Sequence, residues 1–224
     1  MVKQRIIAFS TFLKLIELDE QKKKTMLRGF LRGGGFNYWR PLQVLSQEII
    51  QNKLDFEGLS SKMESFAKGH QQKYNKNALI KILDWKSKRT LLALERQGRF
   101  EYVLGNSGFT VKMEPELAFS LNGSDYLAHV WATNTPTLSE STFSVGLYML
   151  KLAAENHGIK SKNFLIIDTV KDRSFGEFNI LANSESMLNA QSALLGALWQ
   201  EINNTSNSEV GTDVGDYTPP PSFN

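Results

Sequence analysis

The sequence contains no cysteine among its 224 residues and only three histidines. Without cysteine there can be no disulfide, thiolate nucleophile, iron–sulfur ligation or cysteine zinc site. His70, His129 and His157 form no H-x-x-x-H pair that would hold a metal on one helix face. No stretch approaches the 18 consecutive apolar residues of a membrane-spanning helix. We therefore expect a cytoplasmic protein without a membrane partner.

Sequence motifs for phosphate binding and for nucleophilic serine are missing as well. The chain has no G-x-x-x-x-G-K-[ST], and the glycines at 33–35 lack the third spaced glycine and the preceding strand of a dinucleotide fingerprint. The segment 105–108 falls short of G-x-S-x-G and is typical of a turn between strands. Nucleotide binding through these folds and serine hydrolysis are thus disfavoured.

Acidic residues are scarce in the first part of the chain. Residues 1–100 hold 20 Lys and Arg against 9 Asp and Glu, a net charge of +11, whereas residues 101–224 hold 6 against 14, a net charge of −8. Such asymmetry suggests a basic region that meets nucleic acid, an anionic surface or the acidic half of a neighbour. Lysines on solvated helix faces produce the same pattern without any ligand.

Apolar periodicity predicts helices throughout the first 88 residues. Ile6, Phe9, Leu13 and Ile16 share one helical face, which predicts an amphipathic helix over residues 4–18. The same spacing predicts three further helices, over residues 41–52, 57–68 and 75–88. We therefore expect an all-α region at residues 1–88.

The segment 28–41 contains three consecutive glycines, four aromatic residues and three arginines, and we predict that it is a loop leading into a helix. Arginines beside exposed aromatic rings can contact phosphates and stack on bases, and consecutive glycines allow close approach to a ligand. Alternatively, Phe36, Tyr38 and Trp39 anchor the next helix to the core, because aromatic side chains bury large areas.

Beyond residue 88 the apolar pattern changes to the alternation of β-strands. Residues 100–104, 110–113, 116–121 and 126–133 predict an antiparallel meander with an Asn122-Gly123 hairpin turn. A helix that begins with a capping box at 137–140 and stops at Gly158, a buried strand at 164–170 and a helix from the Ser184 cap follow. We expect an α+β or α/β fold, in which helical region 1–88 packs on a mixed-sheet domain, 89–203, before a disordered tail, 204–224.

The order helix, short strands, helix, strand over residues 75–170 resembles the αβββαβ core of the PD-(D/E)XK nuclease-like superfamily. In that family an acid after a proline begins one hairpin strand and a Glu-x-Lys triplet lies on its partner. Pro115-Glu116 matches the first element, whereas residues 126–133 carry neither acid nor lysine and have His129 and Trp131 instead. The resemblance therefore implies an inactive or severely altered nuclease, because the metal lacks its second acid.

Four carboxylates follow or precede predicted strands, namely Glu114, Glu116, Asp168 and Asp172. They could meet at one end of the sheet and hold Mg²⁺, which prefers oxygen ligands. Acids at strand ends also cap turns or face water. Glu116 and Asp168 are the candidate ligands of a metal-dependent phosphodiesterase, and Mg²⁺ is a cofactor only in that case.

We predict a non-enzymatic binding or accessory module whose partner is DNA or RNA. The alternatives are a protein-interaction module that pairs the oppositely charged halves, and a divergent metal-dependent nuclease. The residues predicted to contact nucleic acid are Lys22, Lys23, Lys24, Arg28, Arg32, Trp39 and Arg40.

Overall fold

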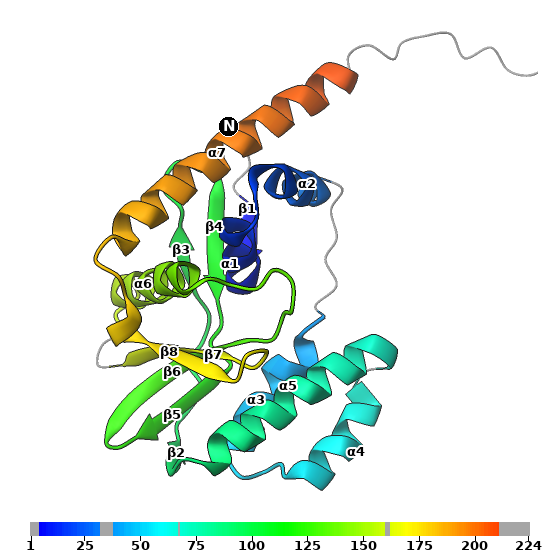
Figure 1. Ribbon diagram of the computed structural model, residues 1–224, viewed down its shortest axis with the longest axis vertical. Coiled ribbons are helices and arrows are strands. Elements are labelled where there is room, and N and C mark those ends of the chain that lie inside the picture. Colours follow the sequence, from blue (N-terminus) through cyan, green and yellow to red (C-terminus); the bar gives the residue numbers. More distant parts are fainter. Residues whose placement is uncertain (1–4, 32–37, 67, 160–161, 211–224) are drawn as a thin grey trace, which may run out of the picture.

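The computed structural model describes residues 5–31, 38–66, 68–159 and 162–210, which form helices and two β-sheets (Figure 1). The smaller sheet has the strand order β1-β4-β3 and consists of β1 (Arg5–Ala8), β3 (Phe100–Val103) and β4 (Phe109–Met113). Strand β1 runs parallel to β4, and β3 pairs with β4 as an antiparallel hairpin.

The larger sheet has five strands in the order β2-β5-β6-β7-β8. They are β2 (Leu91–Ala93), β5 (Leu117–Leu121), β6 (Ser124–Trp131), β7 (Asn163–Asp168) and β8 (Arg173–Gly176). The β6 and β7 strands are parallel, and the other pairs are antiparallel. Asn122 and Gly123 both have positive φ, as a tight hairpin turn between β5 and β6 requires, and this predicted turn is confirmed.

Helices separate and cover the two sheets (Figure 1). Helices α1 (Phe9–Glu17) and α6 (Glu140–Asn156) lie between the sheets. On the other face of the larger sheet lie α3 (Arg40–Ile50), α4 (Phe56–Phe66) and α5 (Gly69–Ser87). Helices α2 (Glu20–Leu31) and α7 (Ser184–Val210) pack together, and the 3₁₀ turn η1 (Glu177–Asn179) follows β8.

The larger sheet is buried on both faces. Trp131 and Ile166 belong to the core shared with α1 and α6, whereas Val130 and Ile167 belong to the core shared with α3, α4 and α5. All four side chains are at most 3% exposed. The prediction of a central strand at 164–170 covered on two sides is confirmed at β7, and the α+β class with mixed sheets is confirmed for the described chain.

Several local predictions are wrong, each because a distant part of the chain supplies a partner. Residues 5–8 form β1 rather than the start of a helix, since β4 offers them a parallel edge, so the first 88 residues are not all-α. The meander is divided, because β4 joins β1 while β5 joins β2. None of the helices in the described part of the chain combines the length and apolar composition needed to cross a membrane.

Two predicted irregular segments are partly helical. Residues 28–31 belong to α2 instead of a loop, because Leu27 on this helix is fully buried in the core between the sheets. Helix α7 continues to Val210, so residues 204–210 are helical rather than a disordered tail. The remaining predicted loop at 32–37 and the predicted tail at 211–224 lie outside the described residues.

Candidate functional site

The position that the nuclease resemblance assigns to a metal ligand is occupied by a buried pair, Glu116 and His129. Glu116 precedes β5 and lies opposite His129 on β6, since Leu117 pairs with Ala128 in the next register position. The Oε2 atom of Glu116 shares a hydrogen bond of 2.9 Å with His129 Nδ1 and accepts one of 2.9 Å from the Val130 amide. Glu116 and His129 are 3% and 7% exposed. This carboxylate is therefore held by its own sheet.

Asp168, the second candidate metal ligand, holds the turn between β7 and β8. Its Oδ1 accepts hydrogen bonds from the amides of Val170 and Lys171, and its Oδ2 accepts one of 2.9 Å from Arg173 Nε. Arg173 also donates to the Leu138 carbonyl. All of these bonds remain within the turn and the segment before α6, so Asp168 has a structural role.

The four candidate carboxylates do not converge. Glu114 forms an ion pair with Lys112 at 3.1 Å, and Asp172 lies 3.8 Å from Lys81. Across the described ranges, no group of three or more Asp, Glu or His side chains could hold a metal ion. These residues therefore do not fit the Mg²⁺ site that the resemblance implies, since Mg²⁺ needs several oxygen ligands around one point.

The predicted lysine cluster on α2 is largely engaged within the protein. Lys23 is 5% exposed, and its Nζ donates to the carbonyls of Ile16 and Leu18 at the end of α1. Burial lowers the pKa of the Lys23 amine, although the acids Asp19, Glu17 and Glu20 nearby oppose the shift. The structure thus engages this amine at the end of α1, and its contact with nucleic acid stays a prediction.

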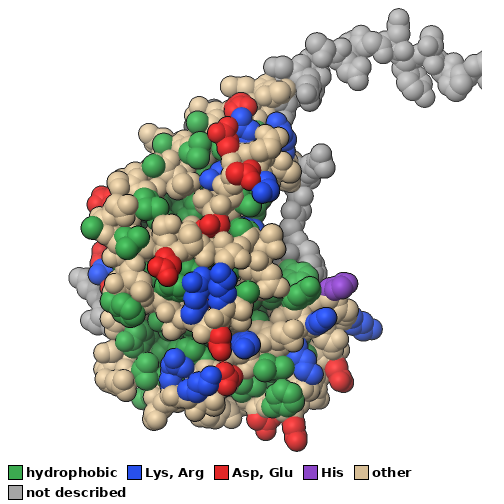
Figure 2. Space-filling model, viewed as in Figure 1, with side chains coloured by type: hydrophobic (Ala, Val, Ile, Leu, Met, Phe, Trp, Pro, Cys, Tyr) green, Lys and Arg blue, Asp and Glu red, His purple; other side chains and the backbone are tan. Residues whose placement is uncertain are grey.

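The other predicted basic residues are dispersed. Lys22 pairs with Asp19 at 2.8 Å, and Lys24 bridges Glu20 and Glu201. Arg28 is exposed on α2, whereas Arg40 is exposed at the start of α3, and these helices lie well apart in Figure 1. Arg32 lies outside the described residues. Figure 2 shows basic and acidic side chains interspersed on the face in view, without one continuous basic surface.

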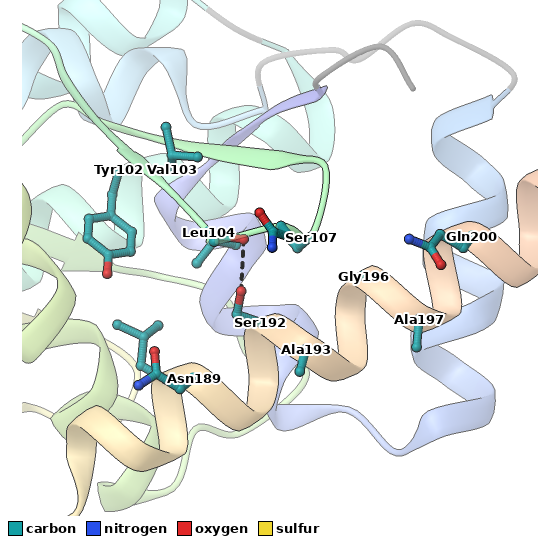
Figure 3. A pocket seen from close by; sticks show the side chains of 13 residues that line it. Tyr102, Val103, Leu104, Ser107, Asn189, Ser192, Ala193, Gly196, Ala197 and Gln200 are labelled. Carbon is teal, nitrogen blue, oxygen red and sulfur yellow. Dashed lines mark hydrogen bonds between the residues drawn. The ribbon is translucent and has the colours of Figure 1, made fainter. Parts of the chain in front are cut away.

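A cavity of about 590 Å³ lies between the β3–β4 turn and α7 (Figure 3). Small side chains and amides line it, and the Ser192 hydroxyl donates a hydrogen bond of 2.8 Å to the Leu104 carbonyl. Tyr102 is the only titratable side chain among its described lining residues. This cavity thus has neither a nucleophile–base pair nor a charged group for catalysis.

A second site lies at the carboxyl ends of the parallel strands β6 and β7, where ligands bind in many open α/β sheets. Two adjoining cavities of about 300 and 320 Å³ share Tyr74, Ala132 and Asn134 as lining residues. We call them together the aromatic cleft. Its lining residues include Lys14, Tyr38, Trp39, Tyr74, Asn77, Lys81 and Asn134, together with residues that directly follow β6 and β7.

Hydrogen bonds from α5 fix the aromatic wall of this cleft. Asn75 is fully buried, and its side-chain amide donates 2.9 Å hydrogen bonds to the Tyr38 and Gln71 carbonyls. Its Oδ1 accepts from the Leu42 amide, which caps the first turn of α3 from outside the helix. Trp39 supplies no side-chain cap of its own. Trp39 packs against the core shared with α3, α4 and α5, as in the anchoring alternative, and it also lines the cleft, with the Tyr38 ring edge-on at 5.1 Å.

The cleft is electrostatically positive. Lys14 is half-buried, burial lowers the pKa of its amine, and within the described chain no carboxylate pairs with it. Burial also raises the pKa of the Tyr38 hydroxyl, with a smaller effect from Tyr74. Lys81 is exposed and weakly paired with Asp172 at 3.8 Å. No Asp or Glu occurs among the described lining residues, so the arrangement suits an anion that carries a flat ring.

The sequence prediction found Trp39 but missed the rest of the cleft. Lys14, Tyr74 and Asn134 come from α1, α5 and the segment after β6, and only the tertiary fold brings them together. The parallel pairing of β6 and β7 could have pointed to this edge, because it is implied by a strand, a crossover helix and a second buried strand.

Comparison with known proteins gives no independent assignment of this site. No protein-family model matches the chain, and no curated protein matches it.

Proposed function

We propose that this protein is a non-enzymatic module that binds nucleic acid through the aromatic cleft. The observation that carries the proposal is a cleft at the carboxyl edge of the sheet with three aromatic rings, two lysines and no acid among its described lining residues. Aromatic rings and positive charge are the two elements that bind single strands without reading sequence. Trp39 keeps its predicted role, while the contribution of the α2 lysines is replaced by Lys14 and Lys81.

The surface of α5 supports this proposal. Tyr74, Asn77 and Lys81 line the cleft from one helix face, at the spacings i, i+3 and i+7. Residues 69–83 contain three lysines and no acid, and Lys73 flanks this face. The helix therefore adds a positive field beside the cleft, which attracts a phosphate backbone over the Debye length of about 8 Å at physiological salt.

The order of elements supports the proposed likeness to nucleases. Helix α5, the strands β2, β5 and β6, helix α6 and strand β7 follow the αβββαβ order, with the β3–β4 hairpin inserted. In this proposed core Glu116 keeps the position of the first acid, but its Oε2 is bound to Nδ1 of His129, which lies on the strand that would carry the second acid and the lysine. We infer that binding persists without cleavage, because no described acid cluster can hold Mg²⁺.

Binding of labelled oligonucleotides tests the proposal. Fluorescence anisotropy with 12-nucleotide DNA and RNA strands and a 12-base-pair duplex is measured at about 50 and 200 mM salt. We expect saturable binding at the lower salt that weakens at the higher one. No binding of any strand at 50 mM overturns the proposal.

The same labelled strands distinguish binding without cleavage from the nuclease alternative. The labelled strands are incubated with the protein and Mg²⁺, and the products are resolved by length. We expect intact strands. Cleavage that Glu116→Ala abolishes in a folded variant would favour a metal-dependent phosphodiesterase instead.

A further inference from the structure

We propose that the aromatic cleft holds one unpaired nucleotide, with its base against Trp39 and Tyr74 and its phosphate at Lys14, so that the protein selects single strands over duplexes. This inference rests on the proposed nucleic-acid function and defines which form of nucleic acid the cleft accepts.

The ring arrangement leaves part of the aromatic surface of the cleft open to a base. Tyr38 and Trp39 are nearly perpendicular, at 77°, so the edge of one ring meets the face of the other without a stacked overlap. The Tyr74 ring stacks with His70 at a centroid distance of 6.3 Å, yet Tyr74 is 40% exposed and lines both cavities of the cleft. Bases stack readily on such faces once they are splayed out of a strand, whereas a duplex keeps its base faces inside the helical stack.

Polar side chains surround the same space and can meet the edges of a base. Asn134 and Thr133 follow the end of β6, and Asn77 lies on α5. Each amide both donates and accepts hydrogen bonds, so it can adapt to more than one base. These contacts favour tolerance of sequence, since Asn134 is an exposed side chain that can adapt to different base edges.

Lys14 provides the counter-charge from the α1 side of the cleft. It lines the same cavity as Tyr38, Trp39 and Tyr74, and it comes from a different element. A half-buried ammonium without a carboxylate partner in the described chain is costly, and a phosphate oxygen would offset this cost. The ring wall and the amine are therefore complementary to the two parts of one nucleotide.

The cavities have a size that suits this ligand. At about 300 and 320 Å³, each is at the lower limit of small-molecule sites, and they join at Tyr74 and Asn134. A base can occupy one while its sugar and phosphate extend into the other. An intact base pair, whose Watson–Crick edge is blocked by its partner strand, cannot enter in the same way.

The test compares a 12-nucleotide oligothymidylate with a duplex of equal length, using the full chain and four variants. Trp39→Ala removes the stacking ring, Trp39→Phe keeps a ring, and Lys14→Gln removes the charge. Lys22→Gln is the matched control, because it makes the same charge change at a residue 70% exposed and paired with Asp19. Thermal unfolding followed by circular dichroism establishes that each variant is folded.

We expect tighter binding of the single strand than of the duplex. Trp39→Ala should weaken single-strand binding about 5-fold to 100-fold, as loss of one stacked base predicts. Trp39→Phe should retain most of the affinity, Lys14→Gln should weaken binding, and Lys22→Gln should leave it nearly unchanged. Adenosine monophosphate in excess should displace the single strand from the parent protein. It should not displace the strand that remains bound to the Trp39→Ala variant.

The outcomes separate this inference from the function on which it rests. If no strand binds at about 50 mM salt, the proposed function itself fails. If the single strand binds but folded Trp39→Ala and Lys14→Gln retain the parent affinity, nucleic-acid binding stands and the nucleotide subsite is overturned. Equal affinity for duplex and single strand overturns the selectivity.

Discussion

Lys14 combines partial burial with a position in the aromatic cleft, and burial lowers the pKa of its amine. In the free protein it therefore loses its proton at a lower pH than an ordinary lysine. Below that pKa the charged amine reduces folding stability, and stability rises as pH increases from the lowered folded pKa toward the unfolded value of about 10.5. A bound phosphate opposes the shift, because it favours the charged form.

Binding of a single strand should consequently weaken as pH rises toward the lowered pKa of Lys14, before most other lysines titrate. The measurement is oligothymidylate affinity from pH 7 to 10 at constant salt. In Lys14→Arg the decline should be displaced to higher pH, since arginine stays charged. Superimposable pH profiles for the parent and Lys14→Arg would contradict a phosphate contact at this residue.

Glu116 should matter for stability and not for binding. Glu116→Ala leaves the Val130 amide and His129 Nδ1 without their acceptor in a buried position, so we expect unfolding to become easier by about 2–4 kcal/mol. Urea denaturation provides this value, and oligonucleotide affinity is measured below the unfolding transition. An unchanged stability would refute the structural role that we assign to Glu116.

Single residues show where sequence information ends. The apolar spacing around Lys23 does not reveal that its amine caps α1, and nothing near Glu116 in sequence identifies His129 as its partner. The position of Pro115-Glu116 at the start of a hairpin strand could be predicted, because alternation and the Asn122-Gly123 turn define β5 and β6 locally. A side chain's partner depends on strand register and tertiary packing.

At the scale of secondary-structure elements, the spacing of apolar residues predicted those helices and strands whose buried residues recur with the period of the element. Helices α3 and α4 lie within two residues of their predicted bounds, whereas α6 starts at Glu140 with Ser139 as its N-cap in place of the predicted Thr137. Strand β1 could not be found in this way, because Ile6 is 55% exposed and its parallel partner is about 100 residues away. Short edge strands carry little periodic signal, and pairing rather than propensity creates them.

The α3–α5 contact gives a test at the scale of elements. Asn75→Ala removes the outside cap of α3 and the bonds that hold the Tyr38 carbonyl, so we expect a loss of about 1–3 kcal/mol in unfolding free energy. Single-strand affinity should also fall, because Tyr38 and Trp39 lose their fixed position. Asn189→Ala, an exposed change on α7, is the matched control. If Asn75→Ala were no less stable than this control, the cap would have no energetic role.

For the whole molecule, the charge asymmetry of the sequence is partly resolved inside the fold. Lys24 pairs with Glu201, and Lys81 approaches Asp172, so basic residues of the first hundred meet acidic residues of the later chain. Exposed pairs of this kind contribute between 0 and about 1 kcal/mol each. The asymmetry could be counted from sequence, but which charges remain open to a ligand depends on how the chain folds around them.

Salt should therefore act strongly on binding and weakly on folding. We assume that Lys14, Lys81 and Arg40 beside Trp39 each neutralise one phosphate. Each such contact contributes about −0.7 to the slope of log affinity against log salt concentration for a single strand, so three contacts predict a slope of about −2. The same salts should change the unfolding free energy by less than about 1 kcal/mol, because the surface pairs are weak. Anisotropy titrations and urea denaturation at about 50, 100 and 200 mM salt measure both quantities. A flat binding slope would exclude phosphate contacts. If the chain binds no nucleic acid, and sedimentation shows self-association that weakens as salt increases, the results would favour the protein-interaction module that pairs its oppositely charged halves.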